Sequence, residues 1–230
     1  MLKYGYALGV AMQKSVILPN YAALESATVT ADPFVHMVVP YFIPQEEQRR
    51  LFANLPDIPA GGSFPPSSLE ISPLLAQLLK EMEGITLRNI IARKLNMDLS
   101  AAPTMLTIRG KTREKDGRIH TDSVAKRVTV LLYLNPSGEE WQHHKGCLRL
   151  LRNAHDIENY VREVQPVDGT LLVFKNGPTA WHGHKRFVGQ RYTIQLNYMT
   201  QDYIAKIELV RHRLSAISKK VMLSYGIGLS

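Results

Sequence analysis

The sequence predicts a mainly β fold, an antiparallel sandwich or open barrel with helices packed on one sheet. Apolar residues recur at helical spacing between residues 69 and 99, strand-like runs fill residues 104–199, and an amphipathic stretch covers residues 202–226. A length of 230 residues, with 45% hydrophobic and 21% charged residues, suits one soluble domain with appendages. We therefore expect an N-terminal extension over residues 1–30, one domain over residues 31–200 and a C-terminal helix over residues 201–230.

The first part of this domain is predicted to be a strand followed by helices. The segment "PFVHMVVPYF" (33–42) alternates apolar residues between bounding prolines, which is typical of a strand. Residues 44–56 have acidic residues early and an apolar side, which predicts a short helix. Between residues 69 and 99 the spacing predicts two helices, separated at Gly84.

The second part is predicted to be a run of strands. β-branched or alternating apolar segments are separated there by glycine, proline, asparagine or charged turns. The predicted strands cover residues 104–110, 127–135, 146–151, 169–176, 179–184 and 191–199. The chain therefore contains helices first, then a run of strands and then one helix. The predicted fold class follows from this order.

Charge and cysteine content restrict the partners and the compartment. The formal net charge is +8 and the pI about 9.6, which suits anionic substrates or partners and leaves nucleic acid as a less favoured one. The single cysteine, Cys147, excludes an internal disulfide and makes a reducing cytoplasm the simplest expectation. No apolar run approaches transmembrane length, and residues 1–15 do not have the pattern of a signal peptide.

A short polar motif, "DGRIHTDS" (116–123), raises the question of a metal site. His120 and Asp122 are two positions apart, so on a strand their side chains would point to the same face. An imidazole nitrogen and a carboxylate oxygen are two of the three ligands in the 2-His-1-carboxylate set that binds ferrous iron. A loop-capping role for both residues is the alternative, because an isolated His-x-Asp occurs often by chance.

A second segment, "PTAWHGHKRFVGQRYTIQLNYM" (178–199), supplies the missing ligand type. It contains His182 and His184, and Arg191 opens the strand that follows. The order is therefore His-x-Asp, several strands, a histidine and then an arginine. Each feature is common alone, but the four together form a specific pattern.

With this pattern the chain resembles the iron(II)/2-oxoglutarate-dependent oxygenases, in particular their prolyl-4-hydroxylase-like branch, over residues 33–200. The segments that carry the resemblance are "PFVHMVVPYFIPQEEQRRL", "HTD", "VTVLLYLN", "KGCLRLL" and "WHGH…GQRY". The resemblance implies a double-stranded β-helix, or jelly roll, with helices on the larger sheet. It also implies an enzyme that hydroxylates a substrate C–H bond with Fe(II), 2-oxoglutarate and O2, releasing succinate and CO2, with ascorbate as a candidate accessory reductant.

The resemblance implies a role for five residues. His120, Asp122 and His182 are expected to bind the iron and to be the catalytic residues; His182 is preferred to His184 because its distance in sequence to the arginine matches the family. Arg191 matches the residue that binds the far carboxylate of 2-oxoglutarate, which a planar guanidinium can hold through two hydrogen bonds. Tyr133 matches a position whose phenol reaches the same carboxylate.

Two alternatives remain. A nucleic-acid dealkylating oxygenase would suit the positive charge, but that branch has a second arginine six residues after the first, where this chain has Asn197. A non-enzymatic cupin-like binding module would not need the arginine. We expect a small-molecule or peptide substrate, with an anionic one suited to the basic surface, and neither nucleic acid nor membrane as partner. The basic segment 109–118 is expected to be a solvated, mobile edge near the mouth of the site.

Overall fold

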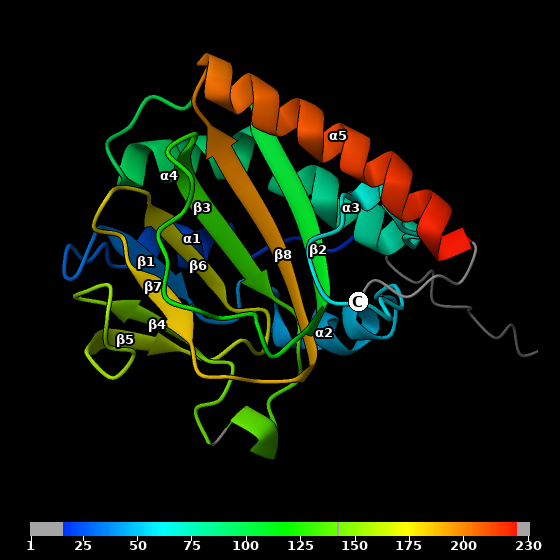
Figure 1. The fold of residues 1–230 in the computed structure, drawn as a ribbon, viewed down its shortest axis with the longest axis horizontal. Helices are drawn as coiled ribbons and strands as arrows, with labels where there is room; N and C mark the ends of the chain where they lie inside the picture. The colour runs from blue at the N-terminus through cyan, green and yellow to red at the C-terminus, as the bar shows by residue number, and fades with distance from the viewer. Residues whose placement is uncertain (1–15, 142, 225–230) are drawn as a thin grey trace, which may run out of the picture.

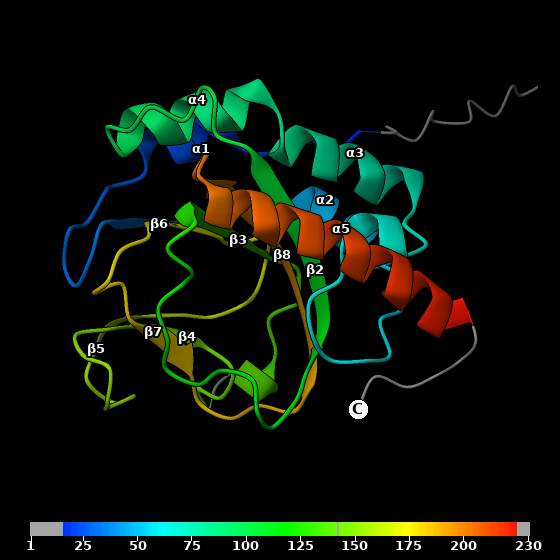
Figure 2. The same cartoon turned by 45° about the horizontal axis from the view of Figure 1, so that its top comes forward.

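Two antiparallel sheets lie face to face, and helices cover the outer face of the larger one (Figures 1 and 2). The structure, a computed structural model, describes residues 16–141 and 143–224. The helices are α1 (Tyr21–Ser26), α2 (Gln45–Phe52), α3 (Pro73–Met82), α4 (Ile85–Lys94) and α5 (Tyr203–Ser224), with short 3-10 turns η1 (Pro66–Ser68) and η2 (Glu139–Trp141). The strands are β1 (His36–Val39), β2 (Thr104–Thr112), β3 (Lys126–Tyr133), β4 (Leu148–Leu151), β5 (Tyr160–Val164), β6 (Leu171–Lys175), β7 (His182–His184) and β8 (Gly189–Met199).

The larger sheet has the strand order β1-β6-β3-β8-β2, and the smaller has the order β5-β4-β7. Strands distant in sequence, such as β3 and β8, pair in the middle of the larger sheet. The predicted arrangement, a mainly β jelly roll with helices on its major sheet, is confirmed by these two facing sheets.

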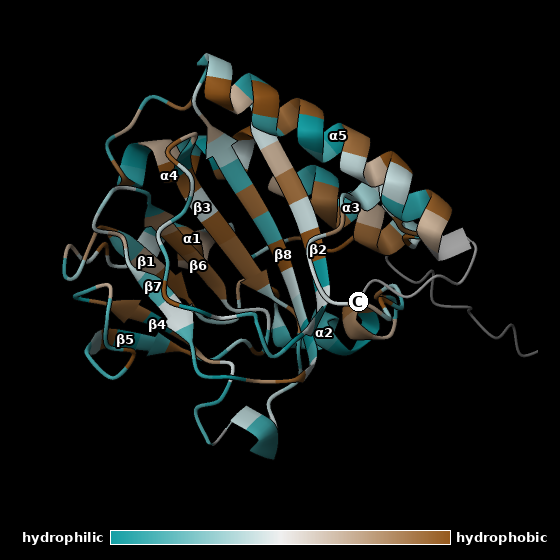
Figure 3. Ribbon diagram, viewed as in Figure 1, coloured by the Kyte–Doolittle hydropathy of each residue, from teal (hydrophilic) through white to brown (hydrophobic). Residues whose placement is uncertain are grey.

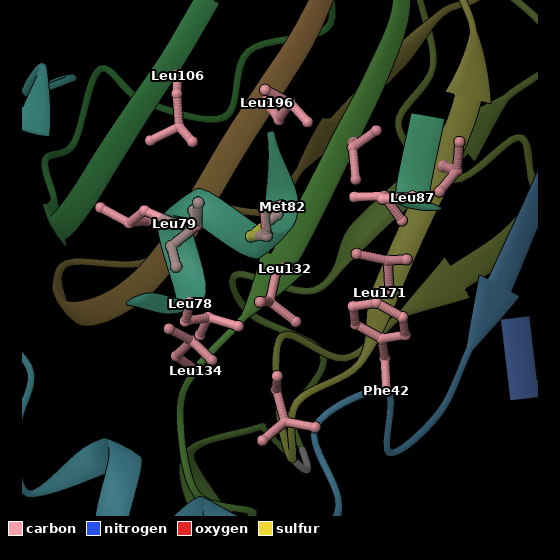
Figure 4. Packing of buried hydrophobic residues seen from close by; sticks show 14 of the residues in the cluster. Phe42, Leu78, Leu79, Met82, Leu87, Leu106, Leu132, Leu134, Leu171 and Leu196 are labelled. Carbon is pink, nitrogen blue, oxygen red and sulfur yellow. The ribbon is translucent and has the colours of Figure 1, made fainter. Parts of the chain in front are cut away.

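The main core lies between the larger sheet and the helices. In Figure 4, leucines of β2, β3, β6 and β8 meet Leu78, Leu79 and Met82 of α3 and Leu87 of α4. These helices bury one apolar stripe each, as the helical spacing predicted, and the strands β3 and β6 are largely hydrophobic (Figure 3). Burial of one such leucine stabilises the fold by about 2 kcal/mol.

A second core fills part of the space between the two sheets. It contains Phe34, Leu148 and Phe174 together with Leu131 and Tyr133 of β3. Leu131, Tyr133 and Leu148 of this core also line a cavity, whose other lining residues are mostly polar.

Part of the expected N-terminal extension contributes to the main core. Ile17 and Leu24 are fully buried in it, and the side chain of Asn20 accepts a hydrogen bond from the Ala23 backbone N–H to cap α1. Residues 1–15, for which no signal peptide was predicted, lie outside the described residues.

Three local assignments differ from the sequence prediction. Strand β5 was not predicted, because it is a half-exposed edge strand with charged residues and no continuous apolar face. Ile85 belongs to the helical spacing but starts α4 with its side chain 65% exposed. His120 forms only an isolated bridge, not a regular strand, and residues 121–123 are irregular.

Helix α5 begins shortly after β8 and contacts the turn η1 (Figure 1). Ala205 and Ala216 are buried on its inner side, whereas several of its larger apolar residues face outward. No helix in the described part of the chain has the length and apolar character needed to span a bilayer.

Candidate active site

A polar inner face of the larger sheet forms the floor of a cavity. Because side chains alternate along a strand, the odd-numbered residues 191–197 of β8 point inward and the even-numbered residues 194–198 join the main core. The same alternation puts Thr129 and Tyr133 of β3 on the inner face, and register pairs Thr129 with Asn197 and Tyr133 with Thr193. The two outer walls are the segment around His120 and strand β7.

His120 and His182 are held side by side by their backbones. Each backbone N–H donates to the carbonyl of the other, over 3.0 and 2.9 Å. The Nδ1 of His120 lies 2.8 Å from the Arg118 carbonyl, and the Nδ1 of His182 lies 2.9 Å from the Ala180 carbonyl. Since a carbonyl can only accept, both Nδ1 atoms carry the hydrogen and both Nε2 atoms keep a lone pair for a metal ion.

Asp122 brings a carboxylate to the same place. Ligand atoms of His120, Asp122 and His182 all lie within 4.8 Å of one another. The Asp122 oxygens accept hydrogen bonds from Lys126 Nζ (2.8 Å) and Thr129 Oγ1 (2.6 Å). Burial alone would raise the pKa of Asp122, but the Lys126 ammonium, His182 and these hydrogen bonds lower it to about 2. Asp122 is therefore ionised, and each oxygen keeps a further lone pair.

His182 is the more deeply buried of the two imidazoles in this cluster. Its side chain is 4% exposed and packs against the Phe174 ring, with centroids 4.9 Å apart. Burial and the neighbouring His120 lower the pKa of His182 to about 4, so it is neutral near pH 7. A neutral imidazole is the form that binds a metal ion.

His184 is separate from this cluster although it lines the same cavity. Its ring packs over Gly117, where a Cβ atom would come within 2.4 Å of the imidazole. Its Nδ1 lies 2.8 Å from the Lys185 carbonyl. Burial and the Arg191 charge lower the pKa of His184 to about 4.

Arg191 and Tyr133 lie together on the floor of the cavity. The Arg191 side chain is 6% exposed, its Nε donates to the Gly146 carbonyl over 2.8 Å, and its Cζ lies 5.2 Å from the centre of the Tyr133 ring. Within the described residues Arg191 has no carboxylate partner. The Tyr133 hydroxyl is buried without a hydrogen-bond partner in that same part of the chain, and burial raises the pKa of its phenol.

Several cavity residues were not predicted from the sequence, and Arg109 is the charged one among them. The basic segment 109–118 was predicted to be a solvated edge, which is wrong for this residue: Arg109 is in β2, its guanidinium lines the cavity and its Nε is buried. The alternation within "TMLTIRG" was the available signal, because Arg109 shares parity with Thr107 and not with the core residues Leu106 and Ile108.

Asn197 occupies the position at which a nucleic-acid dealkylating relative would have a second arginine. It is buried, with its Oδ1 accepting from Gln195 Nε2 (3.2 Å) and lying 3.1 Å from Thr129 Oγ1. Asn197 thus lies beside Thr129, whose hydroxyl donates to Asp122. Through Thr129 it helps to position the histidine-aspartate cluster.

Residues 110–199 match the family model of the 2OG-Fe(II) oxygenase superfamily. Over this segment the chain is similar to the 2OG-Fe(II) oxygenases. The segment contains the histidine-aspartate cluster, Tyr133 and Arg191 but not Arg109. The predicted resemblance to iron(II)/2-oxoglutarate-dependent oxygenases is thereby confirmed over this segment, as is the prediction of an enzyme. The superfamily implies Fe(II), 2-oxoglutarate and O2.

The chain shares its fold with the viral collagen prolyl hydroxylase of Paramecium Bursaria Chlorella virus-1, with a TM-score of 0.50 at 12% identity, covering 76% of this chain and 94% of that chain. A prolyl-4-hydroxylase from Pseudomonas putida is also similar, with a TM-score of 0.49 at 21% identity, covering 72% of this chain and 86% of that chain. No curated protein matches this chain.

Proposed function

We propose that the chain is an Fe(II)- and 2-oxoglutarate-dependent dioxygenase that hydroxylates a C–H bond of a small-molecule or peptide substrate and releases succinate and CO2. The observation that carries the proposal is the placement of two groups in one cavity: the cluster of His120, Asp122 and His182, and the buried Arg191 with no protein carboxylate.

The cluster fits ferrous iron in its donor chemistry. It offers two imidazole nitrogens with free lone pairs and one ionised carboxylate, the set that binds Fe(II) and leaves open positions for other ligands. The Lys126 and Thr129 hydrogen bonds orient Asp122, and backbone carbonyls orient the two imidazoles. His120, Asp122 and His182 would hold the ion.

The floor of the cavity fits the co-substrate. The Arg191 guanidinium needs a carboxylate, and the Tyr133 hydroxyl, buried beside it, needs an acceptor. A 2-oxoglutarate carboxylate would satisfy both groups, while the opposite end of the molecule reaches the cluster. Arg191 and Tyr133 would thus bind and orient the co-substrate.

With 2-oxoglutarate and O2, a bound iron would supply the oxidising power for hydroxylation, with one oxygen atom of O2 inserted into the substrate C–H bond, the other taken up by succinate, and CO2 released. The chain supplies position and shielding. His182 and Tyr133 are buried, so water has little access to the deep side of the cavity. No side chain needs to act as a general base.

The test is 2-oxoglutarate turnover with its dependence on metal and Arg191. We expect purified protein with Fe(II), 2-oxoglutarate, ascorbate and O2 to form succinate slowly without substrate and faster with one. Asp122→Ala should abolish this, and Glu114→Ala, which removes an exposed carboxylate, should not. Calorimetry should show tighter 2-oxoglutarate binding when metal is present. Succinate formation unaffected by Asp122→Ala would overturn the proposal.

A further inference from the structure

Arg109 faces the same cavity as Arg191 from a different strand. Register places Arg109 of β2 opposite Thr193 of β8, and Thr193 opposite Tyr133 of β3. The three residues form one row across the inner face of the larger sheet. Because side chains directly opposite one another in a sheet point to the same side, Arg109 points into the cavity that also contains the histidine-aspartate cluster.

Arg109 has no counter-ion among the described residues. It makes no ion pair there, and its buried Nε lacks a hydrogen-bond acceptor. The carboxylates with the strongest electrostatic effect on it are already engaged: Asp116 accepts from the Arg113 backbone N–H (2.8 Å) and guanidinium (3.2 Å), and Asp122 accepts from Lys126. Burial and the Arg191 charge lower the pKa of Arg109, which shows that its environment disfavours the cation.

Such an arrangement is costly unless an anion compensates it. Arg109 is half-buried, and a guanidinium whose buried Nε lacks an acceptor destabilises the protein. A second guanidinium in the same cavity adds repulsion. Lysine or arginine side chains that serve only solubility remain in water, as Lys111 does two residues later. Arg109 therefore has the features of a ligand-binding group.

The co-substrate does not account for both guanidinium groups. Arg109 and Arg191 are the two cationic side chains that line the cavity, and the carboxylate of Asp122 is already paired with Lys126. The far carboxylate of 2-oxoglutarate would pair with Arg191. Arg109 would then still lack an anion, and a carboxylate of a second ligand would balance it.

We propose that Arg109 binds a carboxylate of the primary substrate, so that the oxidised compound is a carboxylic acid anchored next to the iron site. This inference rests on the proposed oxygenase function and specifies its substrate class. A free amino or carboxylic acid and an acidic side chain of a peptide share the required chemistry.

The experiment compares acids with their neutral amides. The probes are a pool of proteinogenic L-amino acids, the same pool as primary amides, and end-blocked tripeptides containing either glutamate or glutamine. Succinate formation is measured at saturating 2-oxoglutarate, and binding of each stimulating acid is measured by calorimetry on protein loaded with Zn(II) and 2-oxoglutarate, which does not turn over. Stimulation by free acids identifies a small substrate, whereas stimulation by blocked glutamate peptides alone identifies a peptide.

Arg109→Gln is the main variant, and Lys111→Gln is the matched control on the same strand. We expect Arg109→Gln to raise both the KM and the Kd for the stimulating acid by about 30-fold or more, the effect of removing one partner of a buried charge pair. Arg109→Lys should lose less, because the charge remains. The KM for 2-oxoglutarate should change by less than about threefold in all three variants, since Arg109 is not its ligand.

Three results would overturn the inference: equal stimulation by acids and amides, no stimulation or binding by any acid, or a larger effect of Arg109→Gln on 2-oxoglutarate than on the acid. Slow succinate formation without added substrate distinguishes failure of the Arg109 inference from failure of the proposed oxygenase function. If that basal reaction persists in the wild-type protein, only the assignment of Arg109 is lost.

Discussion

His120 and His182 are 62 positions apart in sequence, yet each donates its backbone N–H to the carbonyl of the other, over 3.0 and 2.9 Å. This bridge connects an irregular segment to the end strand of the smaller sheet and places the two imidazole centroids 4.3 Å apart. The backbone bonds position both Cα atoms, and the Nδ1 contacts with the Arg118 and Ala180 carbonyls orient both rings.

Metal binding should depend on His182 and not on His184. His182→Ala removes one of three clustered ligands and should abolish stoichiometric Mn(II) or Fe(II) binding, measured by calorimetry or electron paramagnetic resonance. His184→Ala should retain it, because the His184 ring lies over Gly117 and outside the cluster. Loss of metal only in His184→Ala would reverse the assignment.

Co-substrate affinity should depend on the shape as well as the charge of residue 191. Arg191→Met should raise the Kd for 2-oxoglutarate by about 100-fold, since a buried carboxylate would lose a charged, doubly hydrogen-bonding partner. Arg191→Lys should recover only part of the affinity, because Lys lacks the planar fork. Equal Kd values for wild-type and Arg191→Met protein would contradict this role.

Tyr133→Phe should change stability and binding in opposite directions. The hydroxyl is fully buried without a partner in the described part of the ligand-free protein, so its removal should increase the free energy of unfolding by about 1 kcal/mol. The same change should weaken 2-oxoglutarate binding about tenfold, because a hydrogen bond to a carboxylate is lost. Urea unfolding and calorimetry measure the two effects; a variant that is less stable and binds normally would show a purely structural role.

The metal-free protein should lose stability in mild acid. The pKa values of His182 and His184 are lowered from 6.5 to about 4 in the folded state, so the unfolded chain binds more protons between these values. The free energy of unfolding is highest above pH 6.5 and decreases as the pH falls toward 4. At pH 5 the decrease amounts to about 2 kcal/mol for each of the two residues.

The contribution of His184 can be isolated without disturbing the cluster. In His184→Gln, the difference in unfolding free energy between pH 7 and pH 5, measured with urea, should shrink by about 2 kcal/mol. The exposed control, His155→Gln, should leave the difference unchanged. If His184→Gln keeps the full wild-type difference, the lowered pKa is refuted.

Local patterns in the sequence determined most of the fold. Helical spacing is set within ten residues, so helices α3 and α4 and their separation at Gly84 could be predicted without tertiary information. The strands of the larger sheet are buried on the helix side, and their apolar runs mark them. Strand β5 could not be predicted, because an edge strand needs no apolar face and owes its existence to the partner beside it.

The candidate site divides in the same way. Sequence order was sufficient to select His120, Asp122, His182, Arg191 and Tyr133 as candidates, because their chemical types and spacing resemble a family. Two features of the site cannot be predicted from the spacing of residues in the sequence and depend on the tertiary structure. The His184 ring packs on Gly117, and the Arg109 side chain points into the cavity from the edge strand β2. The physical reason is that a side chain's role depends on which strand faces it, and strand pairing is fixed by burial and backbone hydrogen bonds between residues far apart in the chain.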